Sequence, residues 1–199
     1  MRLLLVRHGE TEENKAGIIQ GWLPGKLTPL GIKQAQQLAK RLKWLKIDYA
    51  FSSDLTRCVD TTQEILKYHL KTKLTLDKRI RERNLGIFQG TKRNKSDWEA
   101  LPDEGNEYFR TPEGGESFAE VQKGVKKFLK ELIKEHSQDT ILVVTHGGTL
   151  IVFRSLLEKK DISDLIQPKV ANNTGLSEYE VNSKGQVKMV CFNCDKHLK

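Results

Sequence analysis

The stretch Leu3-Leu4-Leu5-Val6-Arg7-His8-Gly9-Glu10-Thr11 decides the fold of this chain. Its four consecutive apolar residues predict a short buried strand, long enough to lie in the middle of a sheet. In an open α/β sheet, ligands bind just beyond the carboxyl ends of the strands, so Arg7 and His8 fall where chemistry is expected. Gly9 allows the backbone to turn sharply and a ligand to approach it closely.

A second apolar segment ends in the same way. Ile141-Leu142-Val143-Val144-Thr145-His146-Gly147-Gly148 predicts another buried strand that runs into a histidine. Either histidine alone would more often be packed or solvated than catalytic. Because the carboxyl ends of parallel strands lie at one edge of a sheet, His8 and His146 together indicate a shared site.

Length and composition indicate a soluble single domain. A chain of 199 residues can bury a proper core, and 37% hydrophobic with 30% charged residues is an ordinary globular composition. No segment approaches the roughly 20 apolar residues that a membrane helix needs. The first apolar run is interrupted by Arg7, so it does not resemble a signal peptide. We expect a cytoplasmic protein with no membrane partner.

The chain is basic, with a formal charge of +8 from 34 Lys+Arg against 26 Asp+Glu. A positive charge favours anionic partners without identifying them. Helix-turn-helix, zinc-finger and RNP-like patterns are absent from the sequence, so nucleic acid is not the expected partner. Many of the lysines are predicted to form the solvated face of one helix: Lys123, Lys126, Lys127, Lys130 and Lys134.

The cysteine pattern does not predict a metal site. Cys191 and Cys194, followed by His197, form a C-x-x-C-x-x-H string near the end of the chain. A structural zinc site needs four ligands, and the fourth is missing. Three cysteines, an odd number, in a protein of cytosolic character predict free thiols, Cys58 among them.

Apolar periodicity predicts strands that alternate with amphipathic helices. Strands are expected at 3–6, 47–51, 73–76, 141–145, 177–182 and 187–193, the last two joined by a hairpin-like turn. Helices are expected at 29–45, 55–66, 95–101, 118–132 and 147–157, with Thr28 capping the first, Asp54 or Ser53 the second, and Ser117 with Glu120 the fourth. This order predicts a three-layer α/β fold: a mostly parallel central sheet with helices on both faces.

The predicted fold would gather cationic groups at one edge of the sheet. Arg57 falls in the first turn of a helix, where the positive helix dipole disfavours a cation unless both face an anion. A surface arginine is the alternative interpretation. If the strand ends converge, Arg7, His8, Arg57 and His146 share one pocket. The polar segment 83–114 is the natural candidate for a lid over it.

Such a pocket suits phosphoryl transfer. Arginine forks match phosphate oxygens, and a neutral histidine is a competent nucleophile toward phosphorus. A cationic cradle stabilises the transferring group without a metal. The leaving oxygen also needs a proton, for which Glu82 is the best candidate and Glu10 the alternative.

The ordered motifs resemble the histidine phosphatase superfamily, which contains the cofactor-dependent phosphoglycerate mutases and related phosphatases. Besides Arg7-His8-Gly9-Glu10-Thr11 and His146-Gly147, the matching residues run in family order through most of the chain: Asn14, Gln20-Gly21, Leu27-Thr28-Pro29-Leu30-Gly31, Ser52-Ser53-Asp54-Leu55-Thr56-Arg57, Glu82-Arg83, Gly90 and Gly114-Gly115-Glu116-Ser117. The resemblance implies one phosphoglycerate mutase-like domain over residues 1–199.

The resemblance also implies a role for each matching residue. His8 would become a phosphohistidine, and Glu82 would protonate the leaving group and later deprotonate water. Arg7, Arg57 and His146 would hold the phosphoryl group. The remaining implied contacts are with the phosphate for Asn14, Gln20, Gly21 and Gly147, and with the rest of the substrate for Arg83 and Arg93.

Two departures favour a phosphatase over a mutase. The connection between Glu82 and the Gly-Gly-Glu-Ser turn is shorter than mutases usually have, and Gly148 stands where they tend to have asparagine. A shorter lid would admit water to the phosphohistidine. We therefore expect a phosphatase for small phosphorylated metabolites carrying a second negative group, without a cofactor. A phosphoglycerate mutase is the alternative, and a homodimer is left open. Since all five catalytic-type residues are present, a binding protein that has lost catalysis is disfavoured.

Overall fold

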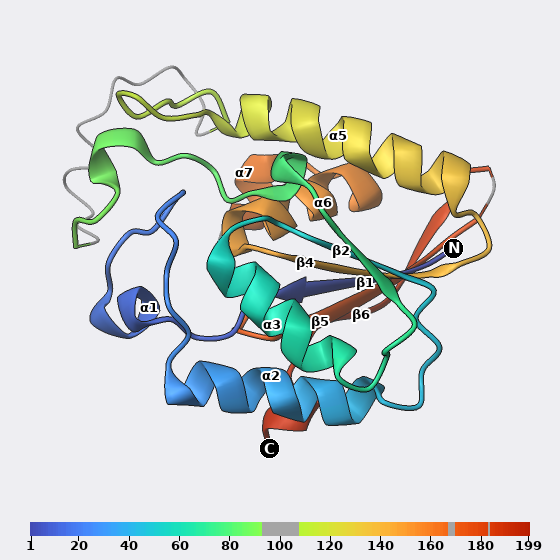
Figure 1. Cartoon of the computed structure of the whole chain (residues 1–199). Helices are drawn as coiled ribbons and strands as arrows, with labels where there is room; N and C mark the ends of the chain where they lie inside the picture. Colours follow the sequence, from blue (N-terminus) through green and yellow to red (C-terminus); the bar gives the residue numbers. More distant parts are fainter. Residues whose placement is uncertain (93–107, 167–169, 183) are drawn as a thin grey trace.

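The computed structural model describes residues 1–92, 108–166, 170–182 and 184–199. In this part of the chain, six strands form one sheet in the order β3-β2-β4-β1-β5-β6 (Figure 1). The strands are β1 (Arg2–Arg7), β2 (Tyr49–Ser52), β3 (Lys73–Leu76), β4 (Thr140–Thr145), β5 (Leu176–Val181) and β6 (Val187–Cys194). The helices are α1 (Glu12–Ala16), α2 (Pro29–Leu42), α3 (Thr56–Leu66), α5 (Phe118–Glu135), α6 (Gly147–Glu158) and α7 (Ile162–Ile166), with short 3-10 turns η1 (Lys78–Ile80), η2 (Gly86–Phe88) and η3 (Lys196–Leu198).

Parallel pairing brings the ends of neighbouring strands to one level. β3, β2, β4 and β1 pair in parallel, whereas β5 and β6 are antiparallel, so the predicted, mostly parallel sheet is confirmed. Arg7 pairs with Thr145, and Ser52 pairs with Val144. The residues after these strands therefore emerge side by side at one edge of the sheet.

The two faces of the central strands fill two separate cores. Leu3 and Leu5 pack against α5 and α6, while Leu4 and Val6 pack against α2 and α3. In Figure 1, α5, α6 and α7 lie on one side of the sheet and α2 lies on the other. All four side chains are fully buried, and each burial stabilises the fold by about 1.5–3 kcal/mol. The predicted three-layer architecture is confirmed.

Two predicted helix starts are confirmed. The hydroxyl of Thr28 accepts the amide hydrogen of Gly31, with Pro29 at the first position of α2. Ser117 and Glu120 form a capping box at the start of α5. Such caps satisfy backbone donors that have no partner within the helix.

The predicted cap of α3 is wrong. Leu55 occupies the capping position, without a side-chain hydrogen bond to the helix. The Asp54 carboxylate instead binds Nε and Nη2 of Arg81. Ser53 accepts the amide hydrogen of Leu55 at 3.3 Å, one turn too early to cap the helix.

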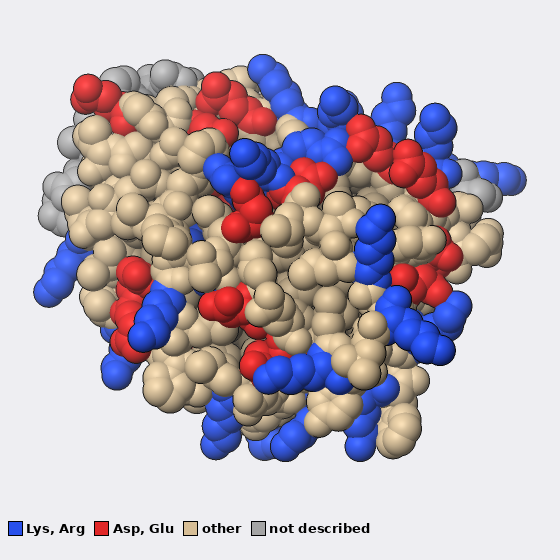
Figure 2. Space-filling model, in the orientation of Figure 1, with Lys and Arg blue, Asp and Glu red and all other residues tan. Residues whose placement is uncertain are grey.

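The remaining expectations concern the edge of the sheet, the lid and the protein surface. β5 and β6 pair as predicted, but the predicted helix over 95–101 and much of the predicted lid over 83–114 lie outside the described residues. On the face shown in Figure 2, Lys and Arg are interspersed with Asp and Glu rather than gathered in one basic stripe. Within the described residues, the helices are too short or too polar to cross a membrane.

Candidate active site

The two histidines that follow β1 and β4 lie together in the protein interior. Their ring centroids are 5.3 Å apart, with the rings inclined at 60°. His8 is 3% exposed and His146 is fully buried. This proximity follows from the register of β1 and β4, which end at the same level. The predicted convergence of the two strand ends is therefore present.

The contacts of His8 define which ring nitrogen can react. Its Nδ1 lies 2.8 Å from the main-chain oxygen of Gly9. A carbonyl oxygen can only accept, so Nδ1 carries the proton and Nε2 keeps its lone pair. Burial, followed by the charges of Arg57 and Arg7, lowers the pKa of His8 well below its usual value. The imidazole is therefore neutral near pH 7.

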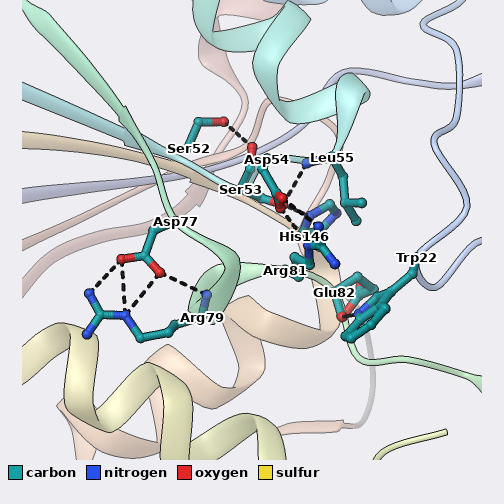
Figure 3. Close-up of polar contacts among 10 residues, drawn as sticks. All are labelled: Trp22, Ser52, Ser53, Asp54, Leu55, Asp77, Arg79, Arg81, Glu82 and His146. Carbon is teal, nitrogen blue, oxygen red and sulfur yellow. Dashed lines mark hydrogen bonds and ion pairs between the residues drawn. The ribbon is translucent and has the colours of Figure 1, made fainter.

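His146 is held in the opposite tautomer. The Nε–H of Arg57 donates to its Nδ1 at 3.2 Å, so the proton of the neutral ring is on Nε2. That nitrogen lies 2.8 Å from the hydroxyl of Ser53 and 3.3 Å from Sγ of Cys58 (Figure 3 shows the Ser53 contact). Burial, with the positive charge of Arg57 next in importance, lowers the pKa of His146 well below its ordinary value.

Arg57 is a buried residue and not a surface arginine. It is 1% exposed and projects from the first turn of α3. Its Nη2 donates to the main-chain oxygen of Gly21 at 2.7 Å, and Nη1 donates to that of Leu23. Nη1 also donates to the main-chain oxygen of Pro24 at 3.4 Å, so four of the five N–H groups of the guanidinium have partners, counting the one to His146, and one is left for a ligand. The same side chain thus joins His146 to the loop at 21–24.

Arg7 and the start of α6 form the other side of the pocket. Nη1 of Arg7 donates to the main-chain oxygen of Ala171 at 2.7 Å. Nε of Arg7 would lie 3.6 Å from a Cβ at Gly147, and Val170 leaves no room for such an atom, at 2.2 Å. Glycine at 147 therefore lets Val170 pack against the start of α6, with Arg7 beside it. A helix N-terminus with an adjacent cation suits a phosphate group.

Glu82 lies at the same helix start. Its Oε2 accepts the amide hydrogen of Gly148 at 3.1 Å, and its Oε1 accepts that of Arg83 at 3.0 Å. A Cβ at Gly148 would come within 2.4 Å of Oε1, so glycine is required for this contact. The alternative acid, Glu10, accepts from the hydroxyl of Thr28 at the start of α2. The geometry favours Glu82.

Three further candidates border the pocket in different ways. Oδ1 of Asn14 accepts from Nδ2 of Asn173 at 3.2 Å, which ties it to the segment of His8. Gln20 is 8% exposed, and its side chain lies beside Arg57 around Gly25. Gly21 contributes a carbonyl oxygen to Arg57, whereas its backbone had been expected to contact phosphate.

Three arginines at alternate positions, from η1 onward, have different partners. Arg79 pairs with Asp77, and Arg81 pairs with Asp54. Arg83 is buried, with its guanidinium 4.3 Å from the ring centre of Phe118. The last candidate, Arg93, lies outside the described residues.

Sequence reasoning missed Trp22, which supports the segment of Glu82. Its indole N–H donates to the main-chain oxygen of Glu82 at 2.7 Å, and the guanidinium of Arg81 lies 4.9 Å from its ring centre. In Figure 3, the Trp22 side chain projects from its own loop toward Glu82. An aromatic residue after Gln20-Gly21 was the available signal, but it does not indicate its partner.

The cysteine-rich end of the chain is separate from this pocket. Across the described ranges, His, Cys, Asp and Glu side chains nowhere form a group of three that could hold a metal ion. Nε2 of His197 lies 3.1 Å from the hydroxyl of Thr174, and its Nδ1 lies 3.3 Å from Nη1 of Arg41. All three cysteines are free, with Cys58 buried beside His146.

The buried neutral histidines predict a pH-dependent stability. An unfolded histidine titrates near pH 6.5, whereas His8 and His146 resist protonation in the folded state. Below that pH the unfolded chain binds more protons, so the free energy of unfolding falls, by up to about 1.4 kcal/mol per pH unit for each histidine.

Urea unfolding between pH 8 and pH 5 measures this dependence. His69 and His197, whose pKa values are also lowered, contribute in the same direction, so the informative quantity is a difference. The slope below pH 6.5 should be shallower in His8→Gln than in the unaltered protein. Equal slopes would contradict the assignment of His8 as neutral.

Comparison with known proteins identifies the family. The sequence matches the histidine phosphatase superfamily (branch 1) over residues 3–195. Phosphoserine phosphatase 1 of Hydrogenobacter thermophilus is 35% identical over 151 residues, covering 73% of this chain and 71% of that protein. Phosphoglycerate mutase-like protein 4 of Arabidopsis thaliana is 35% identical over 180 residues, covering 86% and 76%. The solved phosphoserine phosphatase of Entamoeba histolytica, in complex with 3-phosphoglyceric acid, is 28% identical with a TM-score of 0.84, covering 100% and 99%.

These similarities confirm the expected family, fold and enzyme class. Relatives with mutase names occur, but the phosphatases support the phosphatase interpretation better, because they include both close sequences and a solved structure that superimposes on the whole chain. The protein is accordingly a phosphoric monoester hydrolase. The chain belongs to the histidine phosphatase superfamily, branch 1.

Proposed function

We propose that the protein hydrolyses phosphate esters of small metabolites through a phosphohistidine on His8. The observation that supports this most strongly is the state of the His8 ring. The ring is neutral, with its Nδ1–H bound to the main-chain oxygen of Gly9. Its Nε2 therefore keeps its lone pair, and the charges of Arg57 and Arg7 act on the ring. A nucleophile held in one tautomer needs little reorganisation before it attacks.

In the first proposed step, Nε2 of His8 attacks phosphorus in line with the ester oxygen. The P–O bond breaks as the P–N bond forms. The departing alkoxide takes a proton from the carboxylic acid form of Glu82, because an unprotonated alkoxide is a poor leaving group. Glu82 is suited to this role by its position at the start of α6, where its carboxylate contacts Gly148.

In the second proposed step, water attacks the phosphohistidine. Glu82, now a carboxylate, accepts a proton from that water as the new P–O bond forms and the P–N bond breaks. Inorganic phosphate leaves, and both His8 and Glu82 return to their starting protonation states. The carboxyl group of Glu82 gives up a proton in the first step and takes one in the second, so the cycle needs no other acid.

The positive groups of the pocket would stabilise the transferring phosphoryl group. Phosphoryl transfer requires mainly positioning and stabilisation of charge on the equatorial oxygens. Arg7, Arg57 and the N-terminus of α6 supply positive potential there, and Asn14 supplies an amide. Because His146 is neutral and bonded to Arg57, its role is to orient that guanidinium and to provide a polar surface beside the phosphoryl group.

We further propose that the substrate carries a carboxylate or a second phosphate beside the ester. Arg83 directly follows Glu82 and is buried against Phe118, and its charge would recognise this second anionic group. The relatives support this chemistry: two are phosphoserine phosphatases, and one was solved with 3-phosphoglyceric acid.

Phosphorus NMR distinguishes the phosphatase from the mutase alternative. The protein is mixed with 2,3-bisphosphoglycerate and 3-phosphoglycerate, and separately with phosphoserine, with a chelator present. We expect inorganic phosphate to accumulate without 2-phosphoglycerate. The His8→Ala variant should show neither product. Conversion to 2-phosphoglycerate with little free phosphate would make the enzyme a mutase.

The contact between Glu82 and α6 gives a second prediction. In Gly148→Ala, the new Cβ displaces the Glu82 carboxylate, which is the mobile end of a side chain, so the fold should persist. Loss of the acid should lower kcat/KM, which reports the first step alone, at least about tenfold more for an alkyl phosphate than for p-nitrophenyl phosphate, whose leaving group departs without a proton.

Gly124→Ala in α5 is the matched control. Both glycines are helical, and alanine is favoured at such positions by up to about 1 kcal/mol. A Cβ at Gly124 would meet its nearest neighbour, the main-chain oxygen of Arg79, at an ordinary 3.4 Å. The control should retain full activity toward both esters. An equal loss of kcat/KM for both esters in Gly148→Ala would argue against Glu82 as the acid.

A further inference from the structure

We propose that Asn173 positions the nucleophile and the phosphate-binding amide of Asn14 relative to each other; this inference rests on the proposed function. Nδ2 of Asn173 donates to the main-chain oxygen of His8 at 3.0 Å and to Oδ1 of Asn14 at 3.2 Å. An amide nitrogen has two hydrogens, so both bonds form together. One side chain therefore links the end of β1 to α1.

These contacts determine how Asn14 is oriented. Its Oδ1 receives the amide hydrogen of Thr11 at 3.4 Å as well as the bond from Asn173. Both partners can only donate, so the atom that they share must be the oxygen. The amide nitrogen of Asn14 is consequently the end that remains for a phosphate oxygen. Without Asn173, the capping contact with Thr11 alone would hold this orientation.

The segment that carries Asn173 is built onto the end of β1. The main-chain oxygen of Ala171 accepts from Arg7, and the amide of Thr174 donates to the main-chain oxygen of Arg7 at 3.0 Å. Thr174 is fully buried with φ at +55°, a conformation that a β-branched residue rarely adopts. Such a backbone persists where its surroundings over-determine it. Residues 171–174 thus contact both residues of the Arg7-His8 pair.

The edge of the sheet holds this segment from the other side. Oδ1 of Asn193 accepts the amide hydrogen of Asn172 at 2.8 Å, and Asn193 itself has φ at +46° in the irregular pairing of β5 with β6. His197 contacts the hydroxyl of Thr174. The half-buried Asn173 therefore lies on a segment that hydrogen bonds hold on both sides, and its own two hydrogen bonds have fixed geometry.

The experiment compares Asn173→Ala and Asn173→Asp with the unaltered enzyme, using p-nitrophenyl phosphate. Aspartate has the shape of asparagine but would place an acceptor against two acceptors. We expect kcat to fall about 10- to 100-fold in both variants, with a smaller change in KM, because positioning acts on the reacting geometry. The Asn172→Ala variant alters the exposed neighbouring side chain and should retain the unaltered kcat.

A double-mutant cycle separates positioning from a merely structural role. If Asn173 acts through Asn14, the Asn14→Ala/Asn173→Ala variant should lose clearly less activity than the product of the two single losses. Losses that multiply, or a kcat within twofold of the unaltered enzyme in Asn173→Asp, would overturn the proposal. Failure of the proposed function would differ, because the unaltered enzyme would then have no more activity than His8→Ala.

Discussion

The parallel pairing of β1 with β4 is the constraint on which the pocket depends. Arg7 lies opposite Thr145, so the next residues, His8 and His146, meet at the carboxyl edge of the sheet. A register shift of one residue would turn the buried side chains of β1 to the wrong faces and separate the two rings. The two hydrophobic cores that lock this register therefore also determine the geometry of the proposed site.

The arginines make the site positive, while its buried histidines stay neutral. Arg57 is buried, and a buried charge is costly unless hydrogen bonds compensate it. The carbonyl oxygens of Gly21 and Leu23 and the Nδ1 of His146 supply that compensation. Burial, with the charges of Arg57 and Arg7 next, lowers the pKa of His8 and keeps its ring neutral. One arrangement thus provides both an anion-binding potential and a neutral nucleophile.

Local signals in the sequence were sufficient for much of the fold and for the main candidates. Apolar runs located β1 and β4, and the caps at Thr28 and Ser117 depend on residues three positions apart. Arg57 was found because a cation is unusual in the first turn of a helix, and Glu82 because a leaving group needs an acid and Glu82-Arg83 resembles the family motif.

What could not be predicted depends on contacts between distant segments. Local sequence predicts that Asp54 caps a helix, but its carboxylate instead binds the guanidinium of Arg81, a stronger partner than the backbone amides of the helix. Trp22 and Asn173 reach Glu82 and His8 across the pocket, so their roles appear only once the chain has folded. In physical terms, sequence periodicity reports burial of a single element, whereas a pocket depends on several elements at once.

The most direct test of the account is to trap the intermediate. The enzyme is quenched in alkali during turnover of a radiolabelled phosphate ester, and the labelled peptide is identified by mass spectrometry. If His8 is the nucleophile, an alkali-stable, acid-labile phosphoryl group will be found on the peptide that contains His8 and will be absent from His8→Ala. Turnover with no phosphorylated intermediate, or a phosphoryl group on another residue, would contradict the assignment of His8 as the nucleophile.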